Sequence, residues 1–249
     1  MPTIDLNADI GEGGYDDPEL MQHATSVNIA CGGHAGDPAI MRMTIEASKA
    51  HGVAVGAHPG YEDPDNFGRV ELDLSPDELT DQMKRQLERF LEMHPDMHHV
   101  KPHGALYTQA NVDAAIAATV VLAIMELKPD TLLYCPPSGE LVNVAMKAGL
   151  KTCGEGFIDR TYLACGNLTP RSETDAVIDD FGIATGQAMQ MVMMKSIEAI
   201  DGSRIPLPAE TLCVHGDNPD APDLLLATRE FLGNAGVDFA SPQLTAQAT

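Results

Sequence analysis

Short apolar segments rich in β-branched residues recur along the chain, and most of them are followed by a stretch with helical periodicity. These segments predict seven strands, at Thr3–Leu6, Ser26–Ile29, Val53–Gly56, His98–Lys101, Thr131–Tyr134, Lys151–Gly154 and Thr211–Val214. Strands that alternate with helices are typical of a parallel sheet covered by helices. The pattern therefore predicts an α/β protein made of seven strand–loop–helix units.

Three of the intervening helices have distinctive sequences. Asp37 before Pro38 predicts a capped helix start, and Gly52 predicts the end of that helix. The run Ser75–Glu78 has the pattern of a capping box. The segment Asn111–Leu127 is apolar almost all round, and its 17 residues are too few for a membrane span, so it predicts a buried core helix.

No linker rich in Pro, Gly or Ser interrupts the alternation, which predicts one domain over residues 1–249. The loops Pro59–Asp73 and Phe157–Asp175 are long for such units, as lids and binding loops are. Seven parallel strands can form an open doubly wound sheet or a closed barrel. Polar residues follow nearly every strand and do not gather at one crevice. We therefore expect a distorted TIM-like (β/α)7 barrel.

The composition limits the partners of the protein. The chain has 15 Lys and Arg against 37 Asp and Glu, a formal net charge of −22. Nucleic acid and anionic membranes repel such a surface, so we expect neither as a partner. The five cysteines include no CxxC pair, and residues 1–5 show neither a basic region nor an apolar run. These features predict a protein of the reducing cytoplasm.

Polar side chains gather along the first predicted strand. Asp5, Asn7 and Asp9 alternate, so they share one face, which in a barrel is the interior. Unpaired carboxylates are costly in such a place, and Glu12 follows closely. Because no structural need explains an acidic barrel mouth, we take Asp9 and Glu12 as candidate catalytic groups.

Four of the nine histidines follow four separate predicted strands: His34, His58, His103 and His215. In a barrel the carboxyl ends of the strands converge on the face where active sites are built. We therefore expect these histidines to share one pocket. With the acidic residues of the first strand they are candidates for metal ligation or for general acid–base catalysis.

Further charged residues follow the fourth and sixth strands. Lys101 either stabilises a developing oxyanion or forms a buried salt bridge, and both roles stay open. Arg160 is suited to grip a carboxylate of a substrate through two hydrogen bonds. Glu155 and Asp159 are interpreted as neutralising its charge.

Five blocks of the chain resemble the LamB/YcsF family: DLNADIGE (5–12), NIACGGHAGD (28–37), GAHPGY (56–61), HVKPHGALY (99–107) and CVHGD (213–217). The resemblance covers nearly the whole chain. It implies a (β/α)7 barrel related to the glycoside hydrolase and deacetylase barrels. It also implies cleavage of the lactam of 5-oxo-L-proline to L-glutamate, coupled to ATP hydrolysis, in a complex with separate B and C subunits. ATP binding follows from the resemblance alone, since the chain contains no nucleotide-binding motif.

In the related deacetylases a block of the form NADD supplies a base and a metal-binding aspartate. This chain matches the first three letters and has Ile10 at the fourth. The resemblance makes Asp9 the base and His58 and His103, with Asp9, the candidate metal ligands, while Glu12 would have to replace the missing carboxylate. Because Ile10 offers no lone pair, we expect a divalent metal to be weakly bound or absent. The histidines are then hydrogen-bond donors and proton carriers around the lactam carbonyl.

The predicted catalytic residues are Asp9, Glu12, His34, Lys101 and His103. The predicted substrate-binding residues are Asp5, Asn7, Asn28, His58, Arg160, His215 and Asp217. Together they suit an amide hydrolase in which water deprotonated by Asp9 opens the lactam. Two alternatives remain: a non-catalytic subunit that binds the substrate, and a metal-dependent deacetylase of sugar amides. Only 4% of residues are aromatic, with no Trp, which argues against a sugar-stacking groove.

Overall fold

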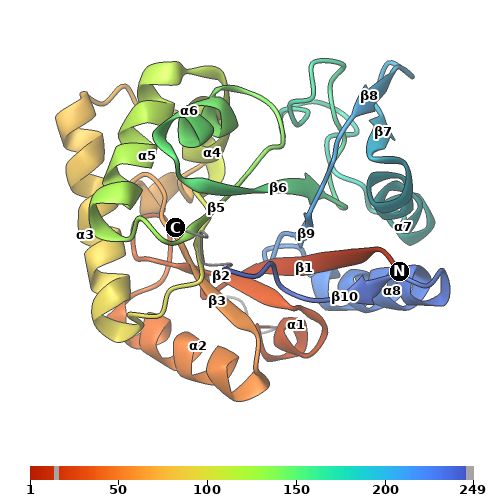
Figure 1. The fold of residues 1–249 in the computed structure, drawn as a ribbon, viewed down its shortest axis with the longest axis horizontal. Coiled ribbons are helices and arrows are strands. Elements are labelled where there is room, and N and C mark those ends of the chain that lie inside the picture. The colour runs from red at the N-terminus through yellow and green to blue at the C-terminus, as the bar shows by residue number, and fades with distance from the viewer. Residues whose placement is uncertain (14–16, 245–249) are drawn as a thin grey trace.

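The computed structural model describes residues 1–13 and 17–244, and within them seven parallel strands form a closed barrel (Figure 1). In order around the barrel, the strands are β1 (Thr3–Ile10), β2 (Ser26–Ala30), β3 (Ala54–His58), β4 (His99–Val100), β5 (Leu132–Cys135), β6 (Lys151–Phe157) and β9 (Thr211–Val214). Pairing of β1 with both β2 and β9 closes the barrel. The predicted α/β barrel with seven units is confirmed, and an open sheet is wrong.

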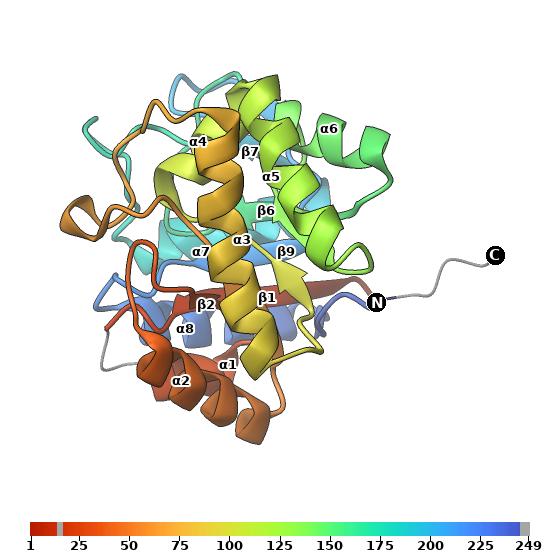
Figure 2. The same ribbon diagram turned by 90° about the vertical axis from the view of Figure 1, so that its left-hand side faces the viewer.

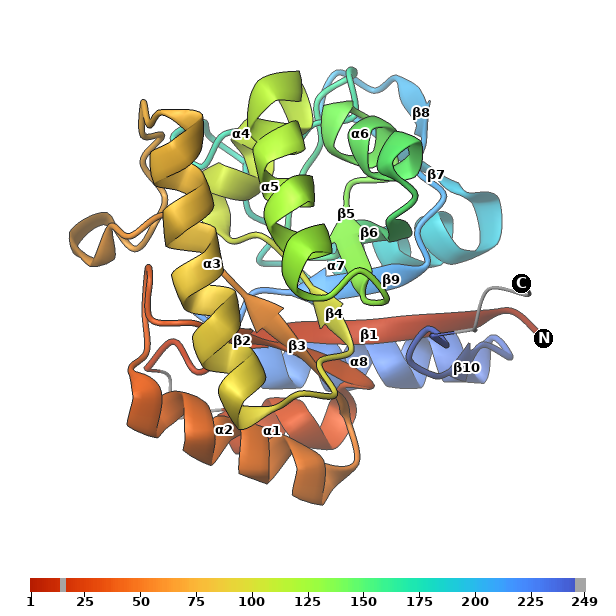
Figure 3. The same ribbon diagram turned by 60° about the vertical axis from the view of Figure 1, so that its left-hand side comes forward.

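Helices cover the outside of the barrel. They are α1 (Asp17–His23), α2 (Pro38–His51), α3 (Pro76–Met93), α4 (Gly104–Val112), α5 (Ala114–Leu127), α6 (Glu140–Ala148), α7 (Phe181–Met189) and α8 (Ala221–Asn234). The helices α3 to α6 lie on one side of the barrel, and α1, α2 and α8 lie on the opposite side (Figure 3). Figure 2 shows α3 packed alongside α5. The predicted caps are present, with Asp37 before α2, Gly52 after it, and a capping box at Ser75 and Glu78.

The helix predicted over Asn111–Leu127 is wrong at its start, because the chain bends by 118° between α4 and α5. The side chain of Asp113 accepts hydrogen bonds from the backbone N–H groups of Ala115 and Ile116, at 2.7 and 3.2 Å. It therefore caps a new helix, a role for which aspartate is preferred. No single helix in the described part of the chain is long and apolar enough to cross a membrane, and α4 and α5 pass that test only as this bent pair.

Several elements outside the barrel had no counterpart in the sequence prediction. A short hairpin of β7 (Ser196–Glu198) and β8 (Arg204–Pro206) follows α7 and one turn of π-helix at Gln190–Met194. The two residues of β10 (Asp238–Phe239) pair with the start of β1. These elements are too short, or too polar, to show a periodic pattern in the sequence.

Polar side chains fill the end of the barrel away from the strand carboxyl ends. Both oxygens of Asp5 accept hydrogen bonds from hydroxyl groups, those of Thr25, Ser26, Tyr134 and Thr211. Each of these partners belongs to a strand of the barrel or to the residue before one. Asp5 therefore connects β1 to β2, β5 and β9 through hydrogen bonds.

The fully buried ring of His99 lies in the same layer and contributes to the pH dependence of stability. It donates from Nε2 to Asn28 at 2.7 Å and stacks on Tyr134 at 3.9 Å. Burial, followed by the charges of His98 and Lys101, lowers the pKa of His99 well below its usual value. Below about pH 6.5 the unfolded chain therefore takes up a proton that folded His99 does not, so stability falls as pH falls.

We expect the His99→Gln substitution to make the pH dependence shallower. His99 accounts for up to about 1.4 kcal/mol per pH unit in the free energy of unfolding between pH 6 and pH 5. Urea unfolding at several pH values measures this slope. An equally steep slope in the variant would contradict the role given to His99.

Candidate active site

A cavity of about 550 Å³ opens among the loops that follow the barrel strands. It is lined by Asp9, His58, Lys101, His103 and His215, which come from or follow four different strands. Both long loops predicted from the sequence also contribute to its wall, the first through Arg69 and Glu71 and the second through residues 160–172. The cavity therefore lies where a barrel of this kind carries its active site.

Lys101 stands at the centre of a buried group of charges. Its ammonium lies 2.9 Å from Asp9 Oδ1, 2.9 Å from Glu155 Oε1 and 2.9 Å from the Cys213 sulfur. These three contacts match the three donors of an ammonium group. Of the two roles left open for Lys101, the structure thus shows the buried salt bridge.

The charges in this group determine its protonation. Burial alone would raise the pKa of Asp9, but the neighbouring His58 ring and the Lys101 ammonium hold it well below its usual value. Burial likewise disfavours a charged Lys101, yet Asp9, Cys213 and Glu155 raise the pKa of its ammonium well above the ordinary range. Asp9 is therefore a carboxylate and Lys101 an ammonium at neutral pH.

The two oxygens of Asp9 differ in their surroundings. Oδ1 accepts hydrogen bonds from Lys101 and from the side-chain amide of Asn28, both at 2.9 Å, and His58 Nε2 lies 3.5 Å away. Among the described residues, Oδ2 has only the thiol of Cys213, at 4.0 Å. Asp9 thus lines the cavity and is held through Oδ1, while Oδ2 has no closer partner among the described residues.

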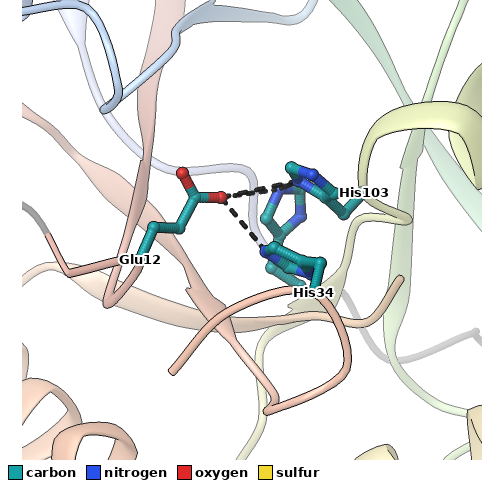
Figure 4. Close-up of side chains that lie close together, drawn as sticks. Glu12, His34 and His103 are labelled. Carbon is teal, nitrogen blue, oxygen red and sulfur yellow. Dashed lines mark hydrogen bonds and ion pairs between the residues drawn. The ribbon is translucent and has the colours of Figure 1, made fainter. Parts of the chain in front are cut away.

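Three histidines and a glutamate form a second group beside Asp9. One ligand atom from each of Glu12, His34, His58 and His103 lies within 4.8 Å of all the others. Figure 4 shows the Glu12 carboxylate directed at His34 and His103. Its Oε1 is 3.2 Å from His34 Nε2, 3.5 Å from His103 Nδ1 and 3.8 Å from His58 Nε2. A possible metal-binding group is therefore present, and it includes His34 in place of the predicted Asp9.

The position of Glu12 corrects one premise of the sequence analysis. Glu12 lies beyond the end of β1, as expected, but the chain turns at Gly11, whose φ of 73° favours glycine. After this turn the Glu12 carboxylate meets the histidines, so the argument that Ile10 leaves the group without a carboxylate is wrong. Burial and the charges of Asp9 and Asp217 raise the pKa of Glu12 well above its usual value.

Two of the histidines donate their ring protons to the backbone. His58 Nδ1 donates to the carbonyl of Lys101 at 2.8 Å, and His103 Nε2 donates to the carbonyl of Phe67 at 2.9 Å. Burial lowers the pKa of His58 to about 4 and lowers that of His103 well below the usual value. In the neutral rings the remaining nitrogens, His58 Nε2 and His103 Nδ1, are acceptors.

His215 lies at the same end of the barrel and lines the cavity. Its Nδ1 is 2.9 Å from Asp159 Oδ2, its backbone N–H donates to the same carboxylate, and its ring stacks on Phe157. Burial opposes ionisation of Asp159, but the charge of His215 and its hydrogen bonds lower the pKa of that carboxyl. The structure thus brings the four predicted histidines to one end of the barrel. His215 is hydrogen-bonded to Asp159, and the other three lie around Glu12.

Arg160 lines the cavity, but much of its guanidinium serves the loop that carries it. Nε donates to the carbonyl of Ala176 at 3.0 Å, and an Nη donates to that of Thr169 at 2.5 Å. Burial and the charge of Arg171 lower the pKa of Arg160 to about 10. Glu155, interpreted from the sequence as neutralising Arg160, pairs with Lys101 instead.

Three predicted substrate-binding residues lie below the cavity lining. Asp5 bonds to hydroxyl groups at the far end of the barrel, as described above. The amide of Asn7 donates to Glu155 and Thr211, and Asn28 connects Asn7 to Asp9. Asn7 and Asn28 therefore support the Lys101 group from beneath, and the structure does not bring Asp5 to the cavity.

Residues to which the sequence reasoning gave another role, or none, also belong to this site. Glu155 and Cys213 hold Lys101, and Arg69 and Arg171 line the cavity and lie 2.6 and 3.8 Å from Asp217. Glu155 stands between two glycines in a strand, an unusual place for a carboxylate, and that signal was available in the sequence. The arginines are in loops, where no periodicity indicates their direction.

Comparison with known proteins gives the family of this chain. The model of the LamB/YcsF family matches residues 4–247. The chain is 44% identical to the A subunit of 5-oxoprolinase from Symbiobacterium thermophilum over 248 residues, which cover 96% of this chain and 95% of that protein. It is 40% identical to a solved lactam utilization protein from Thermus thermophilus, with a TM-score of 0.88 over 96% of this chain and 100% of that one.

A more distant likeness concerns the fold alone. The catalytic domain of a peptidoglycan N-acetylglucosamine deacetylase from Eubacterium rectale aligns with a TM-score of 0.53 at 11% identity, over 98% of this chain and 90% of that one. The two chains thus share the architecture of an α/β barrel. By sequence, the chain belongs to the LamB/YcsF family. The family predicted from the five sequence blocks is confirmed.

Proposed function

We propose that this chain is the A subunit of an ATP-dependent 5-oxoprolinase and carries out hydrolytic chemistry on the lactam of 5-oxo-L-proline. The family relationship supports the substrate class, since relatives of matching length are named as the A subunit of 5-oxoprolinase. The observation that carries the catalytic part is Asp9, an ionised carboxylate that lines a cavity and is held through one of its two oxygens.

Opening a lactam requires a nucleophile at the carbonyl carbon and stabilisation of the charge that develops on its oxygen. In the proposed reaction Oδ2 of Asp9 takes a proton from water as that water attacks the carbonyl carbon. The C–N bond of the ring then breaks, and the proton passes from Asp9 to the leaving nitrogen, which becomes the amine of L-glutamate. Where the carbonyl oxygen carries a phosphoryl group, a second water releases it as phosphate.

Asn28 and Lys101 keep the Asp9 carboxylate in place through its other oxygen. The donors of Lys101 are already bonded to the protein. Lys101 therefore stabilises negative charge in the cavity through its electrostatic field and not through a hydrogen bond.

The charged residues of the cavity wall favour an anionic substrate. Arg69, Lys101, Arg160 and Arg171 line it, although the chain as a whole carries a formal net charge of −22. Such a concentration of cations attracts carboxylates and phosphates. We assign the carboxylate of 5-oxoproline to Arg160 and His215, and Asp217 to the positioning of Arg69.

The size of the cavity supports ATP coupling. A volume of about 550 Å³ falls in the range that holds drug-sized ligands and exceeds the needs of one small lactam. It therefore leaves room for a phosphoryl group on the carbonyl oxygen, which would activate a stable five-membered amide. Separate B and C subunits are the proposed partners in this ATP-dependent step.

Reconstitution tests this function. The chain, its candidate partner subunits, ATP and 5-oxo-L-proline are combined, and L-glutamate and ADP are measured. We expect glutamate only when this chain and ATP are both present. Glutamate formation without this chain, or none in the complete mixture, would overturn the proposal. Acetate release from N-acetylated sugars by the chain alone would favour the deacetylase alternative.

A further inference from the structure

The second group of the site contains a contact that the protein alone does not explain. His58 Nε2 and His103 Nδ1 lie 3.0 Å apart, within hydrogen-bond distance of each other. Both rings have already donated a proton to a backbone carbonyl, from His58 Nδ1 and from His103 Nε2. A neutral imidazole has only one N–H, so in the neutral rings the two facing nitrogens both present lone pairs.

A third electron-rich atom lies beside this contact. Glu12 Oε1 is 3.5 Å from the His103 nitrogen and 3.8 Å from the His58 nitrogen. Among the described residues, Lys101 is the nearest ammonium to Asp9, and its donors are bonded to Asp9, Glu155 and Cys213. Three donors of electron pairs therefore converge, while the nearby cations Arg69 and Lys101 are bonded to other residues, Arg69 to Asp217. A cation between the three would satisfy their lone pairs.

We propose that Glu12, His58 and His103 bind one divalent transition-metal ion such as Zn²⁺, with His34 completing the group. Zinc ligands at 2.0–2.1 Å in a tetrahedron lie about 3.3 Å from one another. Four of the six distances among the ligand atoms are 3.0, 3.2, 3.5 and 3.8 Å, which bracket that value, and all the ligand atoms lie within 4.8 Å of one another. Two histidines with one glutamate are also a ligand set that catalytic zinc sites use.

The outer contacts of the histidines fit the same role. Histidines that bind metal almost always donate their other ring N–H to a carboxylate, a carbonyl or water, which fixes the ring and its tautomer. His58 and His103 do so through Lys101 and Phe67. His34, only 1% exposed, stacks on His103 at 3.6 Å, and its Nδ1 is buried without a hydrogen-bond partner. Burying Nδ1 without a partner costs free energy. Binding of the other nitrogen, Nε2, to an ion would explain why the ring is nevertheless buried.

The test measures binding, so its outcome does not depend on whether 5-oxoproline is the substrate. The chain is freed of metal with a chelator and titrated with Zn²⁺ in a calorimeter, and Co²⁺ then replaces Zn²⁺ for visible absorption. We expect one ion per chain and the visible bands of cobalt bound by nitrogen and oxygen. The Glu12→Gln and His103→Ala substitutions should weaken Zn²⁺ binding by more than about 100-fold, beyond the loss typical of an outer contact.

His51→Ala is the matched control, because His51 lies at the exposed end of α2. It should bind Zn²⁺ as the unchanged chain does. Circular dichroism confirms that each variant is folded, and Glu12→Gln keeps the shape of the side chain. Absence of stoichiometric binding would overturn the proposal and indicate that His58 and His103 share a proton. Zn²⁺ binding that is unchanged in Glu12→Gln and His103→Ala would also overturn the proposal, because it would show an adventitious ion only.

Discussion

The Asp9→Asn substitution is expected to lower the turnover of 5-oxo-L-proline by about 10²–10⁴-fold in the assembled complex. An amide keeps the shape of the side chain and its hydrogen bond to Lys101, but it cannot take a proton from water. Asp9 lines the cavity, and one of its oxygens is held by Lys101 and Asn28, which leaves the other as the proposed base. The steady-state rate of glutamate formation measures the effect.

Glu155→Gln is the matched control for this substitution. Glu155 lies at the same 2.9 Å from Lys101 as Asp9 does, and it is also buried. Replacing it removes one carboxylate partner of Lys101 but leaves the proposed base in place, so we expect a much smaller loss of turnover. Equal losses in the two folded variants would mean that Asp9 acts only through Lys101.

The largest expected effect on stability comes from Lys101→Met. Removing one partner of a buried ion pair leaves the other uncompensated, which costs about 3–5 kcal/mol in the free energy of unfolding. Here Asp9 and Glu155 both lose their ammonium, and both are buried. Urea unfolding of the chain at neutral pH measures the loss.

Two further variants show whether the charge of Lys101 is responsible. Lys101→Met combined with Glu155→Gln should lose less than the sum of the single changes, because the second removes a carboxylate that the first left unpaired. Lys84→Met should barely change stability, because Lys84 pairs with Glu126 at the exposed surface. Additive losses, or a loss at Lys101 as small as at Lys84, would contradict the buried charge group.

The sequence predicted the barrel because each strand is a short apolar run and each helix has its own boundary signals. The predictions for β2 and β9 agree with the structure almost to the residue, and Asp37 and Ser75 cap helices as expected. The break at Asp113 was missed because apolar residues continue on both sides of it, and a single aspartate caps the second helix. The two residues of β10 pair with Thr3 and Ile4, the part of β1 that comes before its pairing with β2 and β9.

Those parts of the site that depend on the order of strands along the chain were predictable from the sequence. Those that depend on the direction of a side chain were not. His34, His58 and His103 follow strands that a closed barrel brings together, so their convergence follows from the topology. The partnership of Lys101 with Glu155 crosses the barrel interior, and no spacing along the chain indicates it. The reach of Glu12 depends on the positive φ of Gly11, a local turn that the strand pattern does not show.

The most direct test of the central claim, that this chain performs the lactam chemistry, is a single turnover with enzyme in excess. The complex is loaded with labelled 5-oxo-L-proline, ATP is added, and glutamate is followed in time, while equilibrium binding of the label is measured separately. With Asp9→Asn, the account predicts 5-oxoproline affinity close to that of the unchanged complex and a chemical step slower by about 10²–10⁴-fold. A chemical step of unchanged rate would contradict the role of Asp9, and if binding were also weaker it would favour a subunit that only binds substrate.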